Sequence, residues 1–117
     1  MATETRTYTY FMLLKTRPAW LAMTRPERRA FRDRYLTPVF ERYPGVKTRF
    51  FDAEAFTGRC SDLMMFETRD PREYHFLVDA LRDTPVFGVP YFDIVDVIPG
   101  VEDGYLEYDR AQVVARV

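Results

Sequence analysis

Two helix-start signals divide this chain into alternating strand and helix segments, and that order constrains the fold more than any other feature. Thr24-Arg25-Pro26-Glu27 places a Glu three residues after a Thr, which is the pattern of a capping box. Asp70-Pro71-Arg72-Glu73 offers a capping Asp and then a Pro at the first helical position. One helix is therefore predicted from Thr24 to about Tyr43, and a second from Pro71 to about Arg82.

Four runs rich in aromatic and apolar residues flank these helices and are predicted to be strands. They are Arg6–Lys15, Val46–Phe56, Cys60–Thr68 and Tyr91–Ile98. Thr57-Gly58 predicts a hairpin loop with a positive φ at the glycine. Pro38 predicts a kink or break in the first helix near Thr37, because proline donates no hydrogen bond to the helical ladder.

The order of strand, helix, strand, strand, helix, strand predicts an α+β fold of the ferredoxin-like βαββαβ type. This fold has a four-stranded antiparallel sheet with two helices on one face, formed here by a single domain over residues 1–117. The other sheet face would be too apolar to leave in water, so we expect a homodimer formed by sheet-on-sheet packing. Residues 99–117 are a possible C-terminal arm that wraps the neighbouring subunit.

The charge balance and the missing motifs exclude several classes of function. Lys and Arg number 17 against 18 Asp and Glu, so no basic field favours nucleic acid or an anionic membrane. One cysteine excludes an internal disulfide, and no membrane-spanning run or signal-peptide pattern is present, which makes the cytoplasm the expected location. A single histidine, no paired cysteines and no glycine-rich phosphate loop predict neither a metal nor a cofactor.

Charged residues concentrate at the mouth of the predicted hairpin. The catalytic candidates there are Arg59 and Asp62. The planar guanidinium of Arg59 suits an anionic substrate group, but the favoured interpretation is an ion pair with Asp52, Glu54 or Asp62 that braces the hairpin. Cys60 is expected to be a buried packing residue rather than a nucleophile.

His75, on the second predicted helix, is the remaining catalytic candidate. A histidine titrates near neutral pH and is therefore suited to act as a general base. The alternatives are a surface or hydrogen-bonded packing residue and, less favoured, a heme ligand.

Aromatic residues beside the first helix and the fourth strand predict a pocket between the helices and the sheet. The substrate-binding candidates are Trp20, Tyr91, Phe92 and Asp93, which suit a flat hydrophobic ligand, although such aromatic residues are more often part of a core. Simple alternation puts Asp93 and Asp96 on opposite strand faces. The inward carboxylate would pair with Arg49, Arg59 or a tyrosine hydroxyl, or else be protonated.

Several ordered motifs resemble the darcynin family. They are Phe51-Asp52-Ala53-Glu54-Ala55-Phe56, Arg59-Cys60-Ser61-Asp62, Leu81-Arg82-Asp83-Thr84-Pro85, Val89-Pro90-Tyr91-Phe92 and Gly100-Val101-Glu102-Asp103-Gly104. The resemblance implies a small protein of the dimeric α+β barrel type, a fold that hosts cofactor-independent monooxygenases, isomerases and cyclases as well as heme-degrading enzymes. It implies no agreed activity and no catalytic residue.

Two functional hypotheses follow from the sequence. The first is a small cofactor-independent enzyme, similar to a cyclase, isomerase or monooxygenase, that acts on an aromatic or polyketide-like metabolite. The second is a non-catalytic protein that binds a small molecule or another protein.

Overall fold

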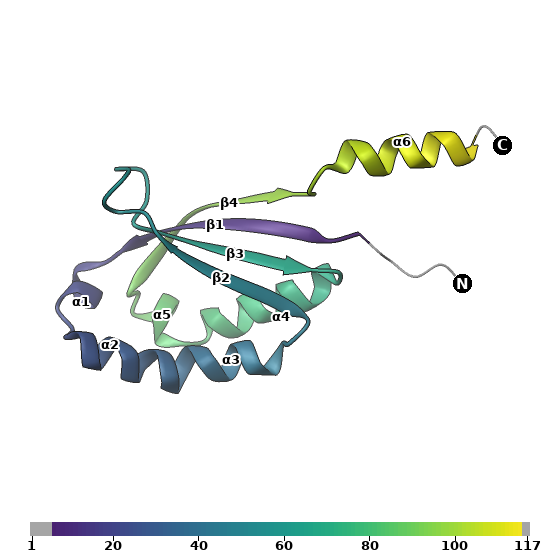
Figure 1. The fold of residues 1–117 in the computed structure, drawn as a ribbon. Coiled ribbons are helices and arrows are strands. Elements are labelled where there is room, and N and C mark those ends of the chain that lie inside the picture. The colour runs from purple at the N-terminus through teal and green to yellow at the C-terminus, as the bar shows by residue number, and fades with distance from the viewer. Residues whose placement is uncertain (1–5, 116–117) are drawn as a thin grey trace.

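A computed structural model describes residues 6–115, and for Val114 and Ala115 it describes the backbone only. The strands are β1 (Tyr8–Thr16), β2 (Val46–Asp52), β3 (Asp62–Thr68) and β4 (Phe92–Gly100). They form one sheet in the order β2-β3-β1-β4, and each neighbouring pair is antiparallel (Figure 1). This confirms the ferredoxin-like arrangement predicted from the order of elements.

The first predicted helix is a succession of α2 (Arg25–Phe31), the π-helical turn η1 (Arg32–Leu36) and α3 (Thr37–Arg42). The capping box is present, since the Glu27 N–H donates to the Thr24 hydroxyl and the Thr24 N–H donates to the Glu27 carboxylate. The predicted irregularity is the π-helical turn, which ends just before Pro38, and the Thr37 N–H reaches back to the Arg32 carbonyl.

The second predicted helix is confirmed as α4 (Pro71–Arg82), with the Asp70 side chain accepting from the Arg72 N–H. Two short helical turns were not predicted, α1 (Pro18–Leu21) and α5 (Pro85–Gly88). Each has a proline in its first turn, where a fixed φ favours helix and no backbone donor is needed. Pro18 and Pro85 therefore each begin a turn of helix.

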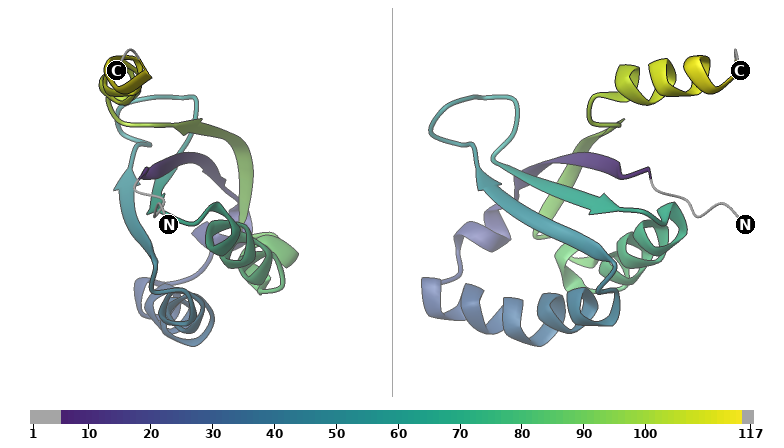
Figure 2. Two further views of the ribbon diagram at one scale, coloured as in Figure 1. Left: turned by 90° about the vertical axis from the view of Figure 1, so that its right-hand side faces the viewer. Right: turned by 45° about the vertical axis from the view of Figure 1, so that its right-hand side comes forward.

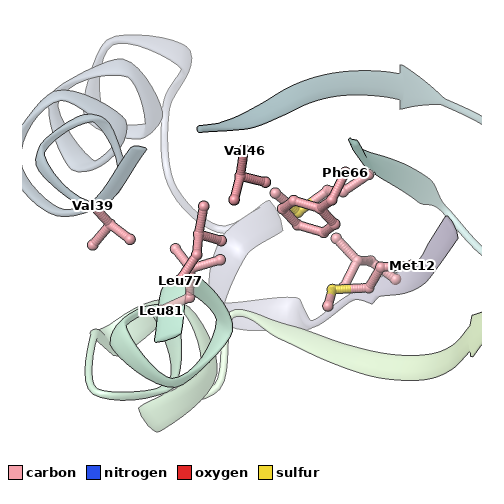
Figure 3. Close-up of a cluster of buried hydrophobic side chains, with 8 residues drawn as sticks. Met12, Val39, Val46, Phe66, Leu77 and Leu81 are labelled. Atoms are coloured by element: carbon pink, nitrogen blue, oxygen red, sulfur yellow. The ribbon is translucent and has the colours of Figure 1, made fainter. Parts of the chain in front are cut away.

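The hydrophobic core lies between the helices and the facing side of the sheet. Its fully buried side chains are Met12 of β1, Phe66 of β3, and Leu77 and Leu81 of α4 (Figure 3). Four further buried residues complete the cluster: Leu14, Val39, Val46 and Met64. The two predicted helices thus lie in one layer on the same sheet face, as expected.

The hairpin between β2 and β3 differs from the prediction. The strands end at Asp52 and Asp62, and residues 53–61 form a longer loop in which the Ala53 carbonyl accepts from the N–H groups of Phe56 and Thr57. Gly58 has no positive φ, so the predicted conformation of this loop is wrong. Buried Ala53, Cys60 and Ser61 anchor the loop, which explains why the ladder stops at the two aspartates.

The expected placement of Asp93 and Asp96 on opposite faces is also wrong. Asp93 is aligned with Lys15, and Asp96 with Leu13, because the β1–β4 register shifts between Leu13 and Leu14. This irregularity adds a residue to β4, so both aspartates lie on the outer face of the sheet, away from the helices. Asp93 pairs there with Arg17, at 3.2 Å between carboxylate and guanidinium, rather than with Arg49, Arg59 or a tyrosine.

The C-terminal segment forms helix α6 (Gly104–Ala115), which projects beyond the sheet (Figures 1 and 2). The chain is accordingly elongated, with a radius of gyration of 17.3 Å. A compact chain of this length would have about 13 Å. None of the helices between residues 6 and 115 combines the length and the apolar content needed to span a bilayer.

Candidate functional site

An open cavity of about 410 Å³ lies between the helical layer and the sheet, toward the loop end of β2 and β3. Its floor comes from Leu14, Met64 and Phe92 of the strands, and its other walls from Leu36, Leu81, Val86 and Phe87 of the helices. The size falls within the range of small-molecule sites, roughly 300–1,000 Å³. The cavity is the candidate functional site.

Trp20 of α1 forms an aromatic wall of this cavity. Its ring centroid lies 5.0 Å from that of Phe92, 5.9 Å from that of Tyr91 and 5.6 Å from that of Phe31. Arg28 fixes this segment, because its guanidinium donates to the carbonyls of Trp20 and Leu21 and lies 5.8 Å from the Trp20 ring centroid. The indole is therefore held in position before any ligand arrives.

Asp52 and Asp62 form a carboxyl pair at the edge of the cavity. They are direct cross-strand partners at the ends of β2 and β3, and both line the cavity. Burial is the main cause that raises the pKa of Asp62, and Asp52 and Glu54 raise it further, although the Ser61 side chain opposes the shift. The Asp62 carboxyl thus retains its proton to a higher pH than an ordinary aspartate.

Carboxylate oxygens of Asp52, Glu54 and Asp62 all lie within 4.8 Å of one another. An oxygen-only donor set of this kind is the type that Mg²⁺, Ca²⁺ and Mn²⁺ prefer. Exposed acidic groups are also common without an ion, and Asp52 and Glu54 are exposed here.

Cationic side chains reach the cavity from the helical layer. Arg28, Arg29 and Arg32 all line it. Arg28 is engaged with backbone carbonyls, and Arg32 lies 3.6 Å from the Asp33 carboxylate with more than half of its side chain exposed. Arg29 forms no ion pair with any residue in the described part of the chain. Arg29 and Arg32 are consequently the groups suited to hold an anionic ligand atom.

The structure brings some of the predicted site residues together and separates others. Trp20, Phe92 and Asp62 line the cavity, and Tyr91 packs behind it against Trp20 and Phe31. Asp93 lies on the outer sheet face. Arg59 lies in the exposed loop outside the cavity lining.

Arg59 also lacks the expected partner. It forms no ion pair with Asp52, Glu54 or Asp62 among the residues from 6 to 115, so the expected bracing role is wrong. Its backbone N–H instead donates to the Thr57 hydroxyl. The adjacent Cys60 is buried, with 4% of its surface exposed, as expected for a packing residue.

His75 lies on the exposed side of α4, with 64% of its side chain exposed. Its Nε2 is 3.0 Å from the carboxylate of Asp79, one turn along the helix. His75 therefore does not meet Arg59 or Asp62 in a common site.

The three cavity arginines were not predicted, because the helical pattern put Arg28, Arg29 and Arg32 largely on the solvent side of the first helix. Their spacing could have indicated a shared site, because Arg28 and Arg29 precede Arg32 by four and three residues and therefore lie beside it on the helix surface. The sequence places Asp52 and Asp62 near the same hairpin, but it does not predict that they lie directly opposite each other, because that depends on the register of the two strands.

Similarity to known sequences identifies the family of this chain. A sequence model of the darcynin family, described as a domain of unknown function, matches residues 2–117. The chain belongs to the darcynin family. Darcynin 1 of Acinetobacter baumannii is 46% identical over 89 residues, which are 76% of this chain and 99% of that protein. A darcynin homolog of Streptomyces avermitilis is 42% identical over 110 residues, covering 93% of this chain and 90% of that protein.

Solved structures similar to this chain support the α+β fold. Chlorite dismutase from Candidatus Nitrospira defluvii, in complex with imidazole, has a TM-score of 0.72 at 22% identity over 86% of this chain. A heme-binding protein from Thermus thermophilus has a TM-score of 0.72 at 16% identity over 86% of this chain. The darcynin chain spans only 42% and 41% of those chains, respectively, so the likeness concerns the fold alone.

Proposed function

We propose that this darcynin binds a small aromatic or polyketide-like molecule in the cavity between the helices and the sheet, and catalyses a proton transfer on it through Asp62. The observation that carries the proposal is a carboxyl pair at the edge of an aromatic-walled cavity of about 410 Å³. The reaction class is an isomerisation or cyclisation that begins with removal of a proton from carbon.

The walls of the cavity suit the body of such a ligand. Trp20, Phe50 and Phe92 present aromatic surface, and Leu14, Leu36 and Val86 present aliphatic surface. Flat apolar molecules are stabilised in such sites by burial and ring contacts, while a few polar groups set their orientation. Arg29 and Arg32 supply the cationic side, which suits a carboxylate or a phenolate oxygen of the ligand.

The acid–base chemistry rests on the two carboxyls. General acid–base catalysis is most effective when the pKa of the catalytic group lies close to the working pH, and the raised pKa of Asp62 is a shift in that direction. Ionised Asp62 would accept a proton from a carbon beside a carbonyl group. The same carboxyl would then return the proton elsewhere on the ligand, while an arginine balances charge on the enolate oxygen.

Heme is the ligand named for one structural neighbour, and the residues of this cavity do not fit it. Axial ligands to heme iron are histidine, cysteine, methionine or tyrosine side chains. The single histidine, His75, lies on the exposed side of α4, and Cys60 and Tyr91 are absent from the cavity lining. Met64 does line it, but this side chain is packed in the hydrophobic core. The donor set therefore favours acid–base chemistry over a heme site.

Deuterium incorporation tests the proposal whatever product the reaction finally yields. Aromatic ketones and β-keto acids would be incubated with the protein in deuterated buffer, and exchange at the carbon beside the carbonyl followed by NMR. We expect accelerated exchange for at least one compound class, and loss of the acceleration in Asp62→Asn. Asp83→Asn, an exposed change at the end of α4, is the matched control and should retain full activity.

The alternative function is non-catalytic binding in the same cavity. It predicts that a ligand protects the protein from thermal unfolding, yet no compound shows accelerated exchange. If Asp62→Asn exchanges as fast as the unaltered protein, the catalytic assignment of Asp62 is refuted while the cavity stays a candidate binding site.

A further inference from the structure

The sheet face opposite the helices carries a continuous apolar surface, here called the outer patch. Its members are contributed by all four strands: Phe11 and Leu13 of β1, Phe51 of β2, Leu63 and Met65 of β3, and Ile98 of β4. Phe11 and Phe51 are each 40% exposed, and Ile98 is 49% exposed. Contiguous apolar surface of this kind on a soluble domain marks an interaction site.

Charges frame the outer patch at two diagonally opposite corners. Arg49 of β2 is aligned across the strands with Met65 and Phe11, and Asp96 of β4 is aligned with Leu13. Their immediate cross-strand neighbours are thus apolar. Neither side chain forms an ion pair with another described residue of the chain.

The other charged side chains of this face have an oppositely charged residue directly across a strand pair. Lys47 is aligned with Glu67, and Lys15 with Asp93, which also pairs with Arg17. Arg49 and Asp96 have no opposite charge aligned with them, so a partner is suited to supply one.

Two projecting segments rise from the same side of the sheet, at opposite ends of the strands. They are the loop of residues 53–61 and helix α6 (Figure 2). Phe56 in the loop is 87% exposed, and Tyr105 and Tyr108 of α6 are 65% and 64% exposed. An isolated helix as short as α6 is marginal in water without a surface to pack on.

We infer that the outer patch binds a second copy of this chain about a two-fold axis, with Arg49 of each copy facing Asp96 of the other. An axis lying in the interface plane and perpendicular to the diagonal between the two corners exchanges them. Each positive corner then falls on the partner's negative corner, while the two apolar patches pack face to face. The two corners are three strand spacings of about 4.8 Å and two residues of about 3.3 Å apart, so the strands of the two sheets would cross at roughly 50°, between the aligned and the orthogonal packing classes.

The outer face of the sheet alone is too small for a stable dimer interface, so α6 and the 53–61 loop would also contribute to it. Four strands at about 4.8 Å spacing and seven residues at about 3.3 Å rise give a face of roughly 450 Å². A stable interface removes about 800 Å² from each partner. The exposed aromatic residues of α6 and of the 53–61 loop, which border the face, are suited to supply the remainder.

Charge-reversal variants test both whether a second copy of the chain binds the outer patch and whether the two-fold axis pairs Arg49 with Asp96. Arg49→Glu would place a carboxylate opposite the partner's Asp96, and Asp96→Arg would place a guanidinium opposite the partner's Arg49. Each variant alone should therefore dimerise at least about tenfold more weakly than the unaltered chain, as measured by sedimentation equilibrium. An equimolar mixture of the two variants should regain the dimer, because both contacts of the mixed pair are then attractive.

Arg82→Glu and Asp83→Arg, on exposed positions of α4 in the helical layer, are the matched controls and should dimerise like the unaltered chain. Circular dichroism would verify that all variants are folded. The inference is overturned if the unaltered chain is monomeric, if both reversed variants dimerise normally, or if their mixture stays monomeric. It does not depend on the proposed activity, which the cavity on the other side of the sheet would supply.

Discussion

Leu77 and Leu81 lie on successive turns of α4, and truncating them should have unequal costs because only Leu81 belongs to the cavity wall. Both are fully buried core residues, 0% and 1% exposed. Removing three carbon atoms from the core costs about 0.8 kcal/mol each, or about 2.4 kcal/mol in total. At position 77 an enclosed hole of roughly 70 Å³ would remain, which adds about 1.7 kcal/mol at about 24 cal/mol per Å³.

The expected loss of unfolding free energy is therefore about 4 kcal/mol for Leu77→Ala. For Leu81→Ala it is closer to the transfer cost of about 2.4 kcal/mol, because the vacated space opens into a cavity that already exists. Urea unfolding of the two variants, with unchanged m-values, gives the comparison directly. Equal losses, or a greater loss at Leu81, would show that the cavity is closed in solution and would refute the reasoning.

Three further predictions concern individual side chains. Because burial raises the pKa of Asp62 in the folded state, the stability linked to this group is full below its unfolded pKa and is lost as the pH rises through its folded pKa. Urea unfolding should accordingly show Asp62→Asn gaining stability relative to the unaltered chain near pH 7 but not near pH 3, and a pH-independent difference would contradict this. Thr24→Ala should lower the unfolding free energy by about 1 kcal/mol through loss of the capping box, and an unchanged melting temperature would count against the cap. His75→Ala should leave the absorbance spectrum of a hemin titration unchanged, whereas loss of a Soret shift would identify His75 as a heme ligand.

The fold was predictable because local signals agreed with one another. The capping box at Thr24, the capping side chain of Asp70 and the proline after each mark the helix starts, and the apolar runs between them allow few arrangements other than a two-layer α+β fold. Errors occurred where tertiary contacts decide the backbone. The hairpin is longer than predicted because buried Ala53 and Ser61 bind the loop to the sheet, which a turn propensity does not reveal.

The candidate site was predictable only in part. Asp62, Trp20 and Phe92 were identified from residue type and position, and they line one cavity. Arg59 and His75 were predicted from the chemistry of their side chains, but residue type alone does not determine whether a loop or a helix face is directed toward the cavity. Asp93 faces away from the cavity because it follows Phe92, which lines the cavity, and successive strand residues face opposite sides. The register shift beyond Ile94 places Asp96 on the same outer face, and a single extra residue of this kind leaves little trace in an apolar sequence.

Titration of Trp20 fluorescence tests the central claim most directly, because Trp20 is the single tryptophan and forms a wall of the cavity. The probes are aromatic carboxylic acids of increasing ring number. We predict a saturable change in emission for the unaltered chain, weakened in the Arg29→Gln/Arg32→Gln variant and retained in Arg34→Gln, which alters an exposed arginine outside the cavity lining. The absence of saturation with every probe, or identical binding by the double variant, would contradict a ligand site in this cavity.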